Sequence, residues 1–441
     1  MNLNGKQLTF RKQRFTLRPY RILILLAAVL GGFFIIRAFQ TEQIKPLFSP
    51  TPFPTRTSAS FAEEGNTFFV AGDLNAAITA YQEAVKIDPT NGDLAADLAR
   101  IQVYSSASLT NDAEKKARLE EALTTINNAK EVDPTNSMVL AVRSFVLDWY
   151  SNPTLVGKEE SEKLLLEANQ EAVTAIQLDN KNTLALAYYA EILNDQQNWL
   201  QAEQYIQQAL QRDPTIMDVH RVNALIQETL SNYGLAIESY KRAAEINPNL
   251  TFLYINIGVN YRQLEQYEMA LEYFAKAANI NETLKVNDPI PYLAIGRTYA
   301  QMGEFFIASR NVMKALQLNP TNSDVYGQIG VIYFKARNYE GAISALKCAV
   351  EGCSAAESCE VRQCDSTVDQ AAVIQGLPLS DSTLEYYLYY SSALAGMHRS
   401  NDDYCSLAKG ILKQLRQNFS DEPVVMQLVQ TNEEICGFPS Q

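Results

Sequence analysis

The chain is poor in glycine and histidine, and it lacks the short motifs that hold phosphates or catalytic metals. Glycine makes up only 19 of the 441 residues, about 4 % against a usual content near 7 %. This scarcity disfavours turn-rich β-sandwiches and barrels, and no G-x-G-x-x-G, Walker loop or H-E-x-x-H motif occurs. The two histidines, His220 and His398, lie outside any nucleophile motif. We therefore expect no catalytic residues, no metal site and no cofactor, and hence no enzyme.

The chain also lacks the positive charge that nucleic-acid binding requires. It has 37 Lys and Arg against 50 Asp and Glu, a net charge of −13, so phosphate backbones are repelled over most of its surface. Residues 1–41 are the exception, with seven basic residues and no acidic one. That head carries +7, which leaves −20 on the rest of the chain because the total is −13. We expect the two parts to lie in different surroundings.

One long apolar run follows most of the basic residues. Residues 22–36 are 15 consecutive apolar or glycine residues, about 22 Å of helix against a hydrocarbon core of about 30 Å. Extending the run through Phe39, with Arg21 and Arg37 reaching toward the headgroups, gives a sufficient span. We predict a retained transmembrane helix over 22–39. A cleaved signal peptide is the alternative, although the bulky Phe39 does not suit a small-residue cleavage site.

The distribution of basic residues predicts the orientation of this helix. Six Lys and Arg precede the apolar run, and three lie in the twenty residues after it. Positive residues stay in the cytoplasm, so residues 1–21 are predicted to be a cytoplasmic tail and the body extracytoplasmic. Residues 40–57 contain four prolines and are predicted to be a semi-rigid linker. The predicted location is the cell membrane, crossed once.

Small residues recur through the middle of the chain at a period near 34. Units that start at Thr183 and Met217 have alanine at the same three offsets: Ala190 and Ala224, Ala202 and Ala236, Ala209 and Ala243. Units that start at Ser58, Thr251, Pro289 and Ser323 have glycine at the eighth position and an aromatic residue at the eleventh. Small side chains let two helices approach where they cross, so each unit predicts a pair of antiparallel helices.

This pattern resembles the tetratricopeptide repeat family, with its W-x2-L-G-x2-Y, A-x3-F and closing Pro. The closing Pro follows Asp or Asn at Asp88, Asp133, Asp213, Asn247 and Asn319, which ends the second helix. The resemblance implies an all-α solenoid of about nine helix pairs after the single transmembrane helix. Its predicted parts are a repeat array over 58–352, a Cys-containing insertion over 353–382, and a degenerate repeat with a capping helix over 383–441.

Two of the predicted eight repeats in the array are longer than the rest. The unit that starts at Gly92 has 11 extra residues and the unit that starts at Ser137 has 12. These residues lengthen either a helix or the loop inside the pair.

All six cysteines lie in the last hundred residues. They are Cys348, Cys353, Cys359, Cys364, Cys405 and Cys436. An even, clustered set on the predicted extracytoplasmic side favours three disulfides. We expect Cys405 to pair with Cys436 and the other four to pair among themselves. A four-Cys zinc site is the alternative, and reduced thiols are expected if the topology is inverted.

The resemblance also implies a binding surface. In the family the first helices line a concave groove, and the positions that face it carry over to this chain as Arg221, Phe252, Ile255, Val259, Arg262, Leu293, Arg297, Phe334 and Lys335. Apolar residues flanked by cations are suited to an extended or helical peptide that carries a carboxylate. The alternative is an ordinary groove surface without a dedicated ligand.

Three functions are consistent with these features. The first is a membrane-anchored scaffold that mediates protein–protein interactions on the extracytoplasmic side. The second is a cytosol-facing membrane receptor or co-chaperone-like repeat protein, although the family's basic-Asn clamp for acidic tails is not evident. The third is an enzyme with an unrecognised site in the C-terminal region.

Overall fold

The computed structural model describes residues 19–40, 56–109, 112–365, 369, 371–399 and 403–438. The chain divides into two compact units, Met1–Arg56 and Thr57–Gln441. Most of the predicted cytoplasmic tail and of the Pro-rich linker lies outside the described residues.

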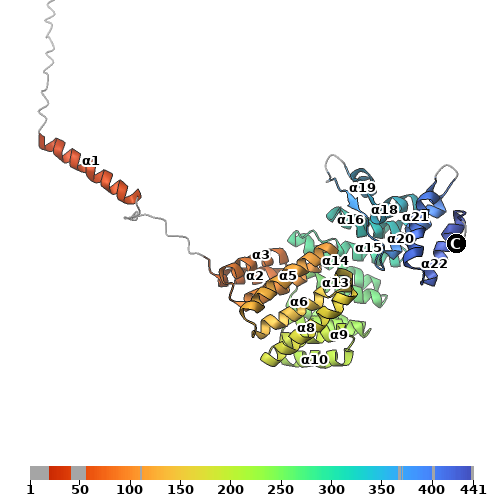
Figure 1. Cartoon of the computed structure of the whole chain (residues 1–441), viewed down its shortest axis with the longest axis horizontal. Coiled ribbons are helices and arrows are strands. Elements are labelled where there is room, and N and C mark those ends of the chain that lie inside the picture. The colour runs from red at the N-terminus through yellow and green to blue at the C-terminus, as the bar shows by residue number, and fades with distance from the viewer. Residues whose placement is uncertain are drawn as a thin grey trace, which may run out of the picture. The chain divides into compact units, whose positions relative to one another are not determined.

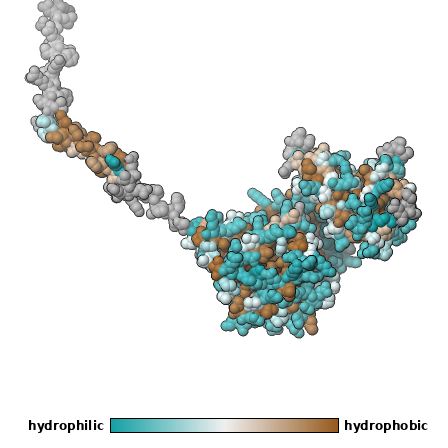
Figure 2. Space-filling view, in the orientation of Figure 1, coloured by the Kyte–Doolittle hydropathy of each residue, from teal (hydrophilic) through white to brown (hydrophobic). Residues whose placement is uncertain are grey.

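The described residues of the first unit contain one helix, α1 (Pro19–Gln40). Its start at a proline is favourable because the first helical residues need no N–H donor within the helix. Its apolar side chains are exposed, for example Leu23 at 69 % and Phe34 at 68 %, and Figure 2 shows the helix as a brown segment. Pro19–Ala38 has the length and composition of a membrane-crossing helix, which a signal sequence shares.

The second unit is a succession of antiparallel helix pairs, so the predicted all-α solenoid is confirmed (Figure 1). The pairs are α2 (Ser58–Ala71) with α3 (Leu74–Ile87), α4 (Gly92–Ser106) with α5 (Asp112–Val132), α6 (Ser137–Tyr150) with α8 (Lys158–Leu178), α9 (Thr183–Asp195) with α10 (Trp199–Arg212), α11 (Met217–Thr229) with α12 (Tyr233–Ile246), α13 (Thr251–Gln263) with α14 (Tyr267–Leu284), α15 (Ile290–Gln301) with α16 (Phe305–Leu318), α17 (Ser323–Lys335) with α18 (Tyr339–Val350), and α20 (Leu384–Met397) with α21 (Tyr404–Asn418). Helix α22 (Pro423–Ile435) packs on the last pair.

The small residues of the repeat lie where the two helices of a pair touch. A Cβ atom on Gly258 would come within 2.4 Å of the Phe274 ring in the paired helix. Ala270 and Ala277, on the same paired helix, are fully buried. Larger side chains at these positions would push the helices apart, and so the recurring Gly and Ala specify the pairing.

The extra residues of the two long units are mainly in their second helices. Helices α5 and α8 have 21 residues each, whereas α3, α10 and α12 have 14 each. The unit that starts at Ser137 also contains the short helix α7 (Pro153–Val156) in its internal connection.

A small insertion interrupts the array after α18. It contains strand β1 (Gly352–Cys353), helix α19 (Ala355–Arg362) and strand β2 (Ile374–Gln375), which pairs antiparallel with β1. These two-residue strands are a small departure from an all-helical body. The cysteines are paired as Cys348–Cys353, Cys359–Cys364 and Cys405–Cys436. All six are thus in disulfides, which leaves none for the alternative zinc site.

Candidate binding groove

The first helices stack on one another, and in the amino-terminal half the side that they share is filled with their own side chains. Arg221 is the clearest case, because only 3 % of it is exposed. Its Nη1 and Nη2 donate to the two carboxylate oxygens of Glu191, at 2.7 and 2.6 Å. Trp149 Nε1 donates to the same carboxylate at 3.1 Å. A buried guanidinium whose two terminal nitrogens both bond an internal carboxylate is not available to a partner.

The charge network continues through Asp218, on the same helix as Arg221, to helix α4. The hydroxyl of Tyr104 donates to the carboxylate of Asp218, which is 2 % exposed, and a guanidinium nitrogen of Arg100 lies 3.9 Å from Asp218 Oδ2. Burial, and then the negative charge of Asp218, raise the pKa of Tyr104 well above its usual value. The arginine charges are therefore neutralised inside the protein.

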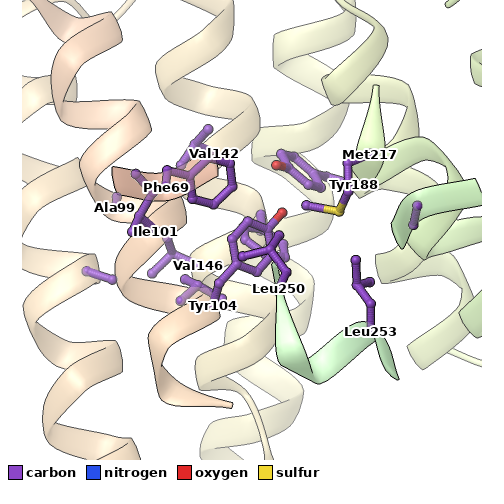
Figure 3. Packing of buried hydrophobic residues seen from close by; sticks show 14 of the residues in the cluster. Phe69, Ala99, Ile101, Tyr104, Val142, Val146, Tyr188, Met217, Leu250 and Leu253 are labelled. Atoms are coloured by element: carbon purple, nitrogen blue, oxygen red, sulfur yellow. The ribbon is translucent and has the colours of Figure 1, made fainter. Parts of the chain in front are cut away.

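The first two helix pairs also contact the start of the sixth pair, which covers this interior. Asn249 Nδ2 donates to the backbone oxygen of Val70 at 3.1 Å, and the rings of Tyr104 and Phe252 stack with centroids 5.5 Å apart. Gly72 makes this approach possible, because it has a φ of +85° and an added Cβ would lie 2.4 Å from the backbone oxygen of Asn249. Figure 3 shows Phe69, Tyr104, Tyr188 and Leu250 gathered between helices of different repeats.

This packing corrects the predicted groove in the amino-terminal half. Arg221 belongs to the core instead of an open surface. Phe252 and Ile255 line a small cavity of about 170 Å³ at the contact between the first and sixth pairs. Val259 is half-buried against the same core.

A larger cleft opens between the first helices of the carboxyl-terminal half. It has a volume of about 340 Å³ and takes residues from α13, α15, α17 and α20. Its lining includes Arg262, Arg297, Gln301, Val331, Lys335, Glu385 and Tyr386. The structure therefore brings together three of the four cations that the sequence analysis placed in one groove.

The charge in this cleft is positive and only partly neutralised. Arg297 Nε donates to Gln328 Oε1 at 3.0 Å, and Lys335 Nζ lies 3.5 Å from Glu385 Oε1. Arg262 differs, because its Nη1 is buried without a hydrogen-bond partner in the described structure. Burial and the positive charge of Arg297 lower the pKa of Arg262. Both effects disfavour the charged guanidinium, and a bound anion would relieve them.

Two of the predicted groove residues support the cleft from behind. Leu293 is 6 % exposed and packs in a core cluster. Phe334 is half-buried and packs against Tyr389, with ring centroids 4.8 Å apart. These two side chains position the helices of the cleft.

Three polar cleft residues were not among the predicted groove residues. They are Gln328, Glu385 and Tyr386. Gln328 orients Arg297, and the hydroxyl of Tyr386 donates to Asp324 Oδ1 at 2.5 Å. Burial and the charge of Asp324 raise the pKa of this tyrosine. The sequence did carry a signal for Glu385 and Tyr386. Both lie on α20, which is the first helix of its pair and therefore forms one wall of the cleft.

The described residues contain no group of three or more His, Cys, Asp or Glu arranged for a metal ion. His220 Nε2 lies 2.8 Å from the backbone oxygen of Pro214, and His398 Nδ1 lies 3.5 Å from the backbone nitrogen of Cys405. Both histidines thus have local backbone partners.

Comparison with known proteins identifies repeats in three segments. Family models described as "TPR repeat" and "Tetratricopeptide repeat" match residues 65–99, 190–251 and 253–284. No curated protein matches the chain.

Three solved structures are similar to parts of this chain. The APC/C hetero-tetramer Cut9–Hcn1 is 15 % identical with a TM-score of 0.49, and the match covers 70 % of this chain and 54 % of that one. A tetratricopeptide repeat protein from Parabacteroides merdae is 18 % identical with a TM-score of 0.36, over 62 % and 97 % of the chains. The Pseudomonas aeruginosa protein pilF is 17 % identical with a TM-score of 0.41, over 60 % and 98 %. The three matched segments, within an array of stacked helix pairs, show that the chain carries tetratricopeptide repeats.

Proposed function

We propose that the chain is a membrane-anchored scaffold that holds a partner protein on the extracytoplasmic side of the membrane. Repeats of this kind suggest a protein-interaction scaffold, and α1 has the properties of a membrane anchor. The three disulfides of the second unit support an oxidising compartment. The basic residues before the apolar run support a cytoplasmic amino terminus.

The partner segment is a peptide that carries a carboxylate, bound in the cleft of Arg262, Arg297 and Lys335. The observation that carries this proposal is the guanidinium of Arg262, whose Nη1 lies buried beside a second arginine and has no hydrogen-bond partner among the described residues. An incoming carboxylate would satisfy this donor and offset the repulsion between the two cations. Hydrogen bonds to charged groups contribute about 1.5–3 kcal/mol each, or roughly tenfold or more in affinity.

The test is site-specific photo-crosslinking of the full-length chain. A photo-reactive residue at Gln301, which lines the cleft, should crosslink the partner in solubilised membranes. Arg262→Glu combined with Arg297→Glu should lower the yield about tenfold or more.

The control changes the same amount of charge on second helices. Arg242→Glu combined with Lys276→Glu alters two exposed cations outside the cleft and should leave the yield unchanged. Equal yields from the cleft variant and the native chain would contradict the assignment of this cleft.

A further inference from the structure

A second cleft lies on the exposed side of α16, away from the groove of Arg262. It has a volume of about 760 Å³, and its lining includes Phe306, Ile307, Arg310, Met313, Lys314 and Arg362. Helix α19 of the disulfide-bonded insertion contacts α16 and supplies Arg362 (Figure 1). The insertion thus adds a wall to a helix face that would otherwise be open.

One face of α16 supplies apolar side chains to this cleft. Phe306, Arg310, Met313 and Lys314 are spaced by four, seven and eight positions and therefore share a face. Phe306 is 76 % exposed and Ile307 is 38 % exposed, and Met313 is half-buried. An apolar floor of this kind suits the apolar side of another helix.

The charge around that floor has one sign. Every charged residue that lines the cleft is basic, namely Arg310, Lys314 and Arg362, although the whole chain has a net charge of −13. Lys314 Nζ lies over the ring of Tyr292, 5.0 Å from its centroid, and within the described residues it makes no ion pair with a carboxylate. Arg310 makes no ion pair within the part of the chain that the structure describes. The cleft is therefore complementary to an acidic ligand.

We propose that this cleft docks an acidic amphipathic helix of a partner protein. Apolar residues of that helix, spaced three or four apart, pack on Phe306 and Ile307, and its carboxylates pair with Arg310 and Lys314. The hollow between α16 and α19 suits a helix better than a flat bilayer surface. This surface is separate from the carboxylate cleft, so either proposal stands if the other fails.

The test is selection from a displayed library of helical peptides on the full-length chain in detergent micelles. The selected peptides should be acidic, with apolar residues three or four positions apart. Their affinity should fall about tenfold or more for Phe306→Ala, and similarly for Arg310→Glu combined with Lys314→Glu. These residues are exposed, so the circular dichroism spectrum of each variant should match that of the native chain.

Two variants serve as matched controls. Lys276 occupies the same place in the preceding repeat as Lys314 and likewise lies over a tyrosine ring, that of Tyr254. Leu200 is 72 % exposed at the second residue of α10, as Phe306 is at the second residue of α16. Lys276→Glu and Leu200→Ala should leave the affinities unchanged.

Three results would overturn the proposal. The first is selection of basic peptides, or of peptides insensitive to Phe306→Ala. The second is that peptides are enriched no more on the native chain than on the triple variant Phe306→Ala, Arg310→Glu, Lys314→Glu. The third is binding of short-chain phosphatidylglycerol that Phe306→Ala abolishes while no peptide is selected, which would assign the surface to lipid.

Discussion

The burial of Arg221 leads to a quantitative prediction about the amino-terminal half. Arg221→Met keeps a similar side-chain volume but removes the cation that binds Glu191 and lies beside Asp218. Both of these acidic residues are only 2 % exposed. Removing one partner of a buried ion pair costs about 3–5 kcal/mol because the other charge is left buried and uncompensated. For a cooperative unit of about 200 residues this lowers Tm by roughly 6–20 °C.

Thermal unfolding followed by circular dichroism measures this loss, and hydrogen exchange in α9 and α11 localises it. The double variant Arg221→Met, Glu191→Leu should recover much of the stability, since no charge of the pair remains. Arg242→Met is the matched control, because Arg242 also pairs with a glutamate, Glu245, but its own side chain is 68 % exposed. This substitution should change the unfolding free energy by no more than about 0.5 kcal/mol. If Arg221→Met behaves like Arg242→Met, the interior is hydrated and open, and the reasoning is refuted.

Three further predictions concern other contacts. Gly72→Ala should destabilise the chain by roughly 1–3 kcal/mol, because the Cβ meets the Asn249 backbone at a positive φ, and hydrogen exchange around Asn249 should accelerate. Burial raises the pKa of Asp288 to about 6, so the folded state binds this proton more tightly than the unfolded state. The unfolding free energy should therefore rise as the pH falls from about 7 toward about 4, by up to about 3 kcal/mol, and Tm measurements should show this gain reduced in Asp288→Asn. Cys405→Ser removes the disulfide to Cys436, which spans 31 positions, and should lower the unfolding free energy by about 2–4 kcal/mol. Hydrogen exchange in α21 and α22 should become faster. Six free thiols in the unreduced, unfolded chain would contradict all three disulfides.

The helix pairs could be predicted because their cause is local. Gly258 and Ala270 each contact the other helix of their own pair, so the spacing within one unit is sufficient to indicate them. The place of the extra residues in α5 and α8 was not predictable, because a longer helix and a longer loop fit the same spacing.

The filling of the amino-terminal groove could not be predicted from single repeats. Position within a unit indicates which side a residue faces, but the rotation between successive repeats decides whether another repeat covers that side. One signal was present in the sequence. Asp218 lies three positions before Arg221 on the same first helix, and Arg100 and Glu191 lie on two other first helices, so charges of both signs were available for mutual pairing. The other three predicted cations, Arg262, Arg297 and Lys335, line the open cleft, whose lining has one acidic residue, Glu385.

The contact between Val70 and Asn249 joins residues that are 179 positions apart. At a synthesis rate of about 5–20 residues per second, the first helix pair waits roughly 10–35 s for that neighbour to be translated. Folding of this half is therefore not a simple addition of one repeat to the next, since its amino-terminal end is completed last. During that interval Phe69 and Tyr104 lack part of their final packing, which makes the nascent chain a candidate for chaperone protection.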